Sequence, residues 1–176
     1  FVNGVLQEDL LPTLPTGVTV ERLNVALQDE DKRAWIQEQT AQESGTAQNT
    51  FLSLNQAFAQ YGLYIETERN AQVEKPIYCL YLSTAGEEAH FSHPQLFVRV
   101  REGSNLSIIE RYQATPATGS YFTNTANWFE VEKNAHCHHY KLQLENGQAL
   151  NVHNTHVRQG RDTTYSNYSL DLGGKV

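Results

Sequence analysis

The sequence contains no methionine, only two cysteines and five prolines, and no long run of apolar residues. Two cysteines in 176 residues do not make a disulfide framework, so we expect a reducing compartment, the cytoplasm. No apolar stretch approaches the roughly 20 residues of a membrane span, which predicts no contact with a membrane. A chain that begins with Phe1 is expected to be an excised fragment, so the absence of a targeting segment carries no argument.

Basic residues are also scarce. Lysine and arginine number 13 against 20 aspartates and glutamates, a net charge of −7, and the acidic residues are scattered. A nucleic-acid-binding protein needs a basic face, so we expect no nucleic-acid partner. Hydrophobic residues make up 39% of the chain, enough for the core of one domain or part of one.

The signatures of common catalytic sites are missing. The sequence has neither the G-x-S-x-G context of a nucleophilic serine nor the G-x-x-x-x-G-K-[ST] loop that holds phosphates. The aromatic residues Tyr121, Phe122, Trp128 and Phe129 alternate too loosely for a sugar-binding platform and are interpreted as core. We therefore predict that the chain is not an enzyme.

Residues 1–62 are predicted to form a hairpin and a small helical segment. Asn3-Gly4 lies between two short apolar arms and suits a type I′ turn. Apolar residues at helical spacing predict a first helix from Val20 to about Gln42, and a second helix follows, capped by Asn49 or Thr50 and stopped by Gly62.

Residues 63–176 have a different texture, because strand formers dominate and no stretch of helical periodicity remains. Four segments repeat one pattern of alternating strand, turn residue and second strand. The turn residues are Asn70, Gly103, Asn134 and Gly160, separated by 33, 31 and 26 positions, and Asn and Gly both tolerate a positive φ. Such a repeat predicts a β-solenoid whose coils share a core. An antiparallel sandwich with irregular hairpins is the alternative.

The stretch "NAHCHHYK" raises the question of a metal site, because imidazole and thiolate are common zinc and iron ligands. In the repeat, Cys137 occupies an apolar position, so it is expected to face the core while His136 and His138 face outward. His139 shares the parity of Cys137 and is expected next to a bend. The four candidate ligands therefore divide between two faces and cannot all bind one ion.

The pair His136 and His138 is the metal candidate that survives this argument. Two imidazoles at i, i+2 can chelate, but a site normally has three or four ligands, and solvent-facing or interface histidines are the plainer interpretation. A cupin site would need a glutamate soon after the H-x-H, and the next acidic residue is Glu145. Cys79, in "IYCLYL", is predicted to lie in the core.

These segments resemble the SufB/SufD family of iron–sulfur cluster assembly proteins. The resemblance is carried by "VEKPIYCLYLST", "SHPQLFVRVREGSNLSIIERY", "YFTNTANWFEVEKNAHCHHYKLQLE" and "THVRQGRDTTYSNYSLDLGGK", which are nearer to SufD-like than to SufB-like members. It extends from about Phe51 to the end, and the "FVNG" start also fits.

The resemblance implies a right-handed parallel β-helix, preceded by helices and truncated in this chain at its C-terminal end. It implies a non-catalytic scaffold subunit of a SufBCD complex, with a SufB-like subunit and a SufC-like ATPase as partners of the full-length parent. The iron–sulfur cluster would be handled by the parent complex, with no cofactor in this fragment, in the cytoplasm or in a plastid if the source is a plant. Family members are longer, and no cluster-related residue can be assigned to a position here.

Three hypotheses therefore remain. The scaffold subunit predicts co-purification of the full-length parent with its two partners. A β-solenoid or cupin-like metalloprotein using His136 and His138 predicts stoichiometric metal. A carbohydrate-binding β-domain predicts tryptophan fluorescence changes with glycans. Because a solenoid cut through a coil presents unpaired backbone groups, we also expect this fragment to self-associate.

Overall fold

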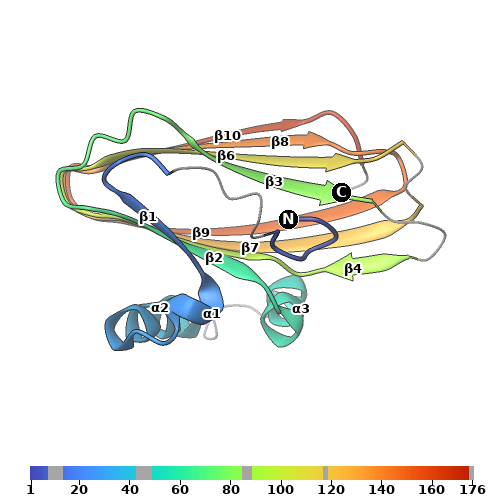
Figure 1. Cartoon of the computed structure of the whole chain (residues 1–176), viewed down its shortest axis with the longest axis horizontal. Coiled ribbons are helices and arrows are strands. Elements are labelled where there is room, and N and C mark those ends of the chain that lie inside the picture. Colours follow the sequence, from blue (N-terminus) through green and yellow to red (C-terminus); the bar gives the residue numbers. More distant parts are fainter. Residues whose placement is uncertain (8–13, 43–48, 85–88, 117–118, 175–176) are drawn as a thin grey trace.

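Strands dominate the computed structural model, which describes residues 1–7, 14–42, 49–84, 89–116 and 119–174. The elements in chain order are β1 (Val18–Arg22), α1 (Leu23–Ala26), α2 (Glu30–Gln42), α3 (Thr50–Phe58), β2 (Gly62–Thr67), β3 (Ile77–Ser83), β4 (His90–Ser92), β5 (Gln95–Val100), β6 (Asn105–Ala114), β7 (Tyr121–Val131), β8 (His136–Leu144), β9 (Ala149–Gln159) and β10 (Thr164–Asp171). Figure 1 shows the strands as two layers, with the helices outside one of them.

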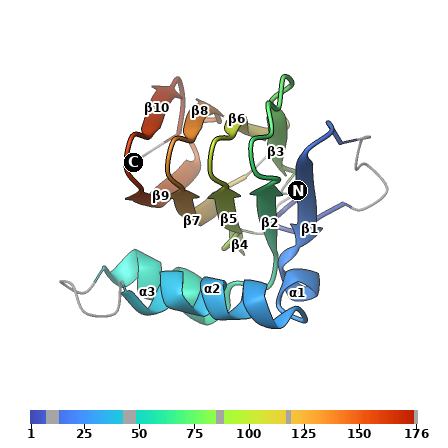
Figure 2. The same ribbon diagram turned by 90° about the vertical axis from the view of Figure 1, so that its left-hand side faces the viewer.

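The strands form a parallel β-solenoid, as the repeat predicts. One sheet contains six strands in the order β1-β2-β5-β7-β4, with β9 also paired to β7, and the other has the order β10-β8-β6-β3. Among the named strands of the described residues, every pair from β2 onward is parallel, and β1 pairs antiparallel with β2. The view in Figure 2 shows successive coils side by side. The antiparallel sandwich is excluded.

The turns between the two sheets stack in register, with one correction to the predicted repeat. Asn70, Gly103 and Asn134 have positive φ values of 59°, 72° and 57°, as expected. In the fourth turn the left-handed residue is Asp162 (φ 57°), two positions after Gly160. Thr164 pairs with His136, so Asp162 and not Gly160 stacks on Asn134. Gly160 is required for another reason, because a Cβ there would lie 2.8 Å from the backbone nitrogen of Lys133.

The N-terminal hairpin is confirmed, but the first helix is shorter than predicted. Val2 bridges Val5 around Asn3 and Gly4, whose φ values are 48° and 82°. The prediction began the helix at Val20, but residues 18–22 form β1, whose backbone pairs with β2 and which starts with the β-branched residues Val18, Thr19 and Val20. The short helix α1 follows, and the longer helix α2 begins at Glu30.

The two helix boundaries nearby have local causes. The Asp29 carboxylate accepts hydrogen bonds from the backbone N–H groups of Asp31 and Lys32, at 3.0 and 3.1 Å. This cap begins α2 as a helix separate from α1. The second predicted helix is present, and Asn49 caps it through the N–H of Leu52. It ends at Phe58, and Gly62 opens β2 rather than stopping the helix.

Apolar side chains fill two separate regions. The first lies between the sheets, where the inward residues of successive coils stack, including Ile65, Val98, Leu106 and Cys137. The second lies outside the six-stranded sheet, where Trp35 and other side chains of α1, α2 and α3 pack on the strands. Thus the helices cover the outer face of the six-stranded sheet.

A ladder of alternating charges runs across that covered face. Glu66, Arg99, Glu130 and Arg158 come from four neighbouring strands and are paired in register. Arg99 Nε lies 2.9 Å from Glu130, and Arg158 also reaches Glu38 of α2 at 2.7 Å. Because these groups are partly buried, the alternation favours one register between coils over a slipped one.

Within the described residues, no helix is long and apolar enough to cross a membrane.

Candidate functional site

The histidine stretch lies on β8, and its side chains alternate as predicted. His136 is exposed and His138 half-buried on the outer face of the four-stranded sheet, whereas Cys137 is fully buried. His139 also points inward and is buried within the regular strand, so the expected bend is absent. Among the described residues, no group of three or more His, Cys, Asp or Glu side chains is placed to hold a metal ion. The pair His136 and His138 remains a prediction.

The inward side of this stretch belongs to a buried polar network centred on Glu110. The Glu110 carboxylate accepts hydrogen bonds from the Tyr112 hydroxyl (2.6 Å), the Asn127 amide (2.7 Å) and Nε2 of His139 (2.6 Å). Nδ1 of His139 lies 2.8 Å from the hydroxyl of Tyr165 on β10. The network therefore links three successive coils across the interior.

These contacts keep Glu110 ionised inside the solenoid. Burial is the largest single effect and raises the pKa, but the hydrogen bonds from His139 and Tyr112 and the charges of His139 and His153 together leave the pKa of Glu110 below its ordinary value. The pKa of Tyr112 is raised well above the ordinary value by burial and by the charge of Glu110. The phenol therefore stays protonated and donates to the carboxylate.

The interior becomes more polar towards the later coils. The inward row that contains Ile77 and Ile108 continues with His139 and Asn167, and the next row continues from Glu110 to Lys141. Lys141 pairs with Asp171 at 2.8 Å. His153 of β9 faces the same region, and burial lowers its pKa to about 4. The later coils thus place charged and neutral polar groups beside the apolar core, and Asn167 and Asp171 of the last strand are exposed.

Neither cysteine is a reactive thiol in this structure. Burial raises the pKa of Cys79 and of Cys137 to about 12. Both side chains are confirmed as core residues, with exposed fractions of 5% and 0%. A thiol in this state is protonated at neutral pH, and the thiolate is the form that binds metal or attacks sulfur.

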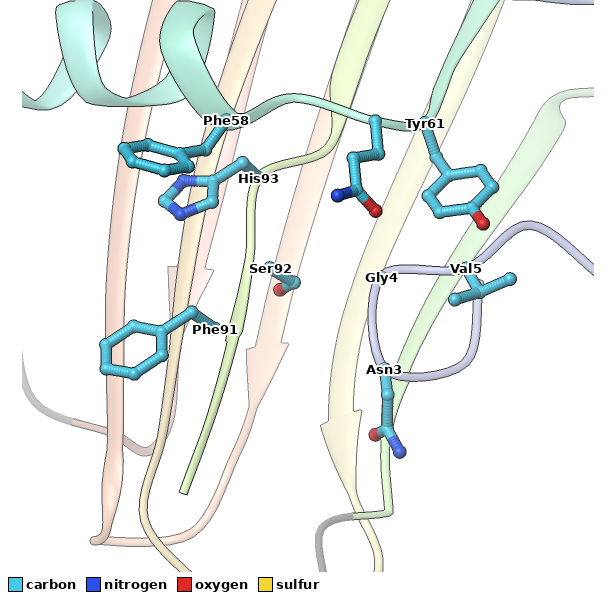
Figure 3. Close-up of a pocket in the computed structure, with 9 residues that line it drawn as sticks. Asn3, Gly4, Val5, Phe58, Tyr61, Phe91, Ser92 and His93 are labelled. Atoms are coloured by element: carbon cyan, nitrogen blue, oxygen red, sulfur yellow. The ribbon is translucent and has the colours of Figure 1, made fainter. Parts of the chain in front are cut away.

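A hollow of about 230 Å³ lies on the surface between the N-terminal hairpin, the end of α3 and β4 (Figure 3). The Phe58 ring packs against His93, with centroids 5.9 Å apart, and Phe91 is 70% exposed beside it. Its lining side chains are apolar or neutral polar, and it lacks converging charged groups. The segment "HFSHP" at its edge forms the short strand β4 and the connection to β5.

Sequence reasoning missed the Glu110 network although the alternation contained the signal. Glu110 shares the parity of Leu106, Ile108 and Tyr112, all of which face inward. A glutamate within a strand is normally expected on the solvent face, because a carboxylate is costly to bury without partners. Of the four aromatic residues interpreted as core, Tyr121, Trp128 and Phe129 are buried and Phe122 is only partly so.

Comparison with known proteins agrees with this architecture. The family described as "SUF system FeS cluster assembly, SufBD core domain" matches residues 81–176, and "SufBD protein N-terminal region" matches residues 1–79. The chain belongs to the SufB/SufD family. The expectation from the sequence resemblance is thereby confirmed at the level of the family, including its place among iron–sulfur cluster assembly proteins.

Three curated relatives are similar to this SufB/SufD chain. It is 33% identical over 131 residues to Protein ABCI7, chloroplastic, of Arabidopsis thaliana, covering 72% of this chain and 28% of that protein. It is 24% identical over 187 aligned positions to an iron–sulfur cluster assembly SufBD family protein of Synechocystis, and the alignment covers 100% of this chain and 40% of that protein. It is 30% identical over 132 residues to iron–sulfur cluster assembly protein SufD of Escherichia coli, and the alignment covers 72% of this chain and 30% of that protein. The chain thus spans less than half the length of these relatives.

Proposed function

We propose that this chain is part of a SufD-like subunit of a SufBCD iron–sulfur cluster assembly complex, and that it acts as a non-catalytic scaffold through protein–protein contacts. The proposed partners of the full-length parent are a SufB-like subunit and a SufC-like ATPase. The proposed location is the cytoplasm, or a plastid if the source is a plant. The similarity to Escherichia coli SufD supports the SufD-like assignment.

The state of the two cysteines is the observation that carries the scaffold role. A protein that builds a cluster on its own side chains needs thiolates or other exposed ligands. Cys79 and Cys137 are buried, and their pKa values of about 12 keep them protonated. In an iron–sulfur assembly family, a segment with buried thiols contributes most simply by holding other subunits.

The test uses the full-length parent, produced together with the SufB-like and SufC-like proteins of the same organism. We expect a complex of all three in size-exclusion chromatography with light scattering. We also expect cluster formation on the complex to be unchanged in a Cys79→Ala/Cys137→Ala variant that retains its circular dichroism spectrum. Failure of the three proteins to associate, or loss of cluster formation in the folded variant, would overturn the proposal.

A further inference from the structure

The outer face of the four-stranded sheet presents apolar rows to solvent. We call it the open face and define it by the outward residues of β3, β6, β8 and β10. In register across the strands, one row is Tyr78, Ile109, Tyr140 and Tyr168, and the next is Leu80, Arg111, Leu142 and Leu170. Tyr78, Tyr168 and Leu170 are 51%, 56% and 50% exposed. A contiguous apolar surface of this kind marks an interaction site.

The two sheets differ in what lies over them. Side chains of α1, α2 and α3 bury the apolar outer residues of the six-stranded sheet, including Tyr64, Phe97 and Trp128. Figures 1 and 2 show these helices on that side only. In the part of the chain that the structure describes, no helix lies over the open face.

Arg111 is the single Asp, Glu, Lys or Arg residue among the outward positions of the open face. It lies between Leu80 and Leu142 in the middle of its row. The side chain is half-buried, its Nε has no hydrogen-bond partner, and the described residues give it no ion pair. Covering such a guanidinium without a carboxylate would leave a charge unpaired, which costs several kcal/mol. Whatever covers this face therefore has to bring an acidic group.

The covered face of the same molecule shows how a helix meets this requirement. Glu38 of α2 presents its carboxylate to Arg158 of β9 at 2.7 Å, while Trp35 of the same helix packs on the strands. Arg99 lies 5.6 Å from the centre of the Trp35 ring. A strand arginine, a helix carboxylate and an apolar stripe together form the contact. The open face has the arginine and the apolar rows, but within the described residues no helix covers them.

We propose that the open face is the docking surface for an amphipathic helix of a partner subunit, which sets apolar residues on the tyrosine and leucine rows and a carboxylate against Arg111. This inference rests on the proposed function, because it assumes that the chain works in an assembly. A second copy fits less well, since a symmetric face-to-face contact would bring two positive charges to one apolar surface. Further solenoid coils would add at the edge of β10, not over the face.

The experiment uses the full-length parent with the SufB-like and SufC-like proteins of its organism as probes. Arg111→Glu reverses the charge on the open face, and Arg161→Glu is the matched control, on a side chain that is 81% exposed in a turn. We expect Arg111→Glu to weaken complex formation about tenfold or more in a titration, with Arg161→Glu within about twofold. Circular dichroism and thermal unfolding check that both variants fold.

Hydroxyl-radical footprinting of Tyr140 and Tyr168 gives an independent readout. We expect both to be oxidised in the isolated parent and protected severalfold in the complex. If both tyrosines are already protected in the isolated monomer, the parent covers its own open face. If the protection appears with self-association, a second copy covers that face. Either result overturns the inference. A complex that forms with both tyrosines still reactive, or with unchanged affinity for Arg111→Glu, overturns the inference alone. Failure to form a complex overturns the proposed function and the inference together.

Discussion

Glu110 is a carboxylate held away from water by three hydrogen bonds, from Tyr112, Asn127 and His139. Replacing the carboxylate with an amide removes the charge and turns one of its two oxygens into an NH2 donor, so either the Tyr112 hydroxyl or the His139 and Asn127 side chains lose their acceptor in a buried site. We expect Glu110→Gln to lower the free energy of unfolding by about 3 kcal/mol, because breaking a buried pair is far costlier than breaking an exposed one. Equilibrium unfolding in urea at pH 7 measures this.

The control for that measurement is Glu102→Gln, which removes a carboxylate that pairs with Arg69 on the surface at 2.8 Å. Both side chains of that pair are well exposed, so we expect a change below about 1 kcal/mol. Equal effects of the two substitutions would contradict a special role for the network.

His153 provides a prediction for the pH dependence of stability. Burial lowers its pKa to about 4 in the folded state, with Lys141 adding to the shift, while Glu110 and Asp171 oppose it. The unfolded chain binds a proton near pH 6.5 and the folded chain does not, so stability falls as the pH drops from about 7 to 4. We expect this group to contribute roughly 2–3 kcal/mol to that loss.

The variant His153→Phe tests this origin. Its ring can keep the edge-to-face contact with Tyr112, whose ring centroid lies 4.5 Å away, and neither His153 nitrogen has a hydrogen-bond partner among the described residues. We expect the variant to show a smaller loss of unfolding free energy between pH 7 and 4.5. The same slope in both proteins would rule out His153 as the source. Glu110, whose pKa is lowered in the folded state, makes a further loss of stability as the pH falls through its titration range. Glu145, whose pKa is raised, has the opposite effect and makes the folded state relatively more stable at lower pH.

At the scale of elements, the stacked turns depend on residues that accept a left-handed backbone. Asn134 has a φ of 57° and its backbone N–H donates to the carbonyl of Arg161 in the next turn. We expect Asn134→Gly to change the unfolding free energy by less than about 0.5 kcal/mol and Asn134→Val to reduce it by about 1–2 kcal/mol. Urea unfolding of the two variants gives the comparison.

Lys133→Val is a control at the preceding position, where φ is not positive and the side chain is exposed. It adds the same branched side chain without backbone strain, and we expect little effect. If valine were equally well tolerated at both positions, the left-handed turn would not be a source of specificity in this repeat.

At the scale of the whole molecule, the solenoid has open sheet edges. Among the described strands, β10 is the last of its sheet and β9 pairs only with β7. Exposed leucines lie on or next to these strands: Leu150 on β9, Leu170 on β10 and Leu172 directly after β10. Unpaired strand edges next to apolar side chains recruit other strands, so we expect the 176-residue chain to self-associate. Light scattering over a wide concentration range tests this, and a constant monomer mass would contradict it.

Strand alternation allowed much of the candidate site to be predicted from the sequence. The inward position of Cys137 and the outward positions of His136 and His138 followed from the period of two. The buried state of Glu110 did not, because its burial depends on partners that are 2, 17 and 29 positions away in the sequence. A residue's parity is local information, whereas the partners that make its burial tolerable come from other coils.

Strand alternation and turn residues act within a few positions, so the amino-acid sequence was enough to predict a repeat of strands and turns with a family likeness. Which turn residues stack on one another depended on contacts between coils. The residue that stacks on Asn134 is Asp162, whereas the repeat predicted Gly160. The tertiary structure also decided that β1 is a strand and that the helices cover one sheet and leave the other open. The physical reason is that register and coverage are settled by hydrogen bonds and packing between coils, which no local pattern contains.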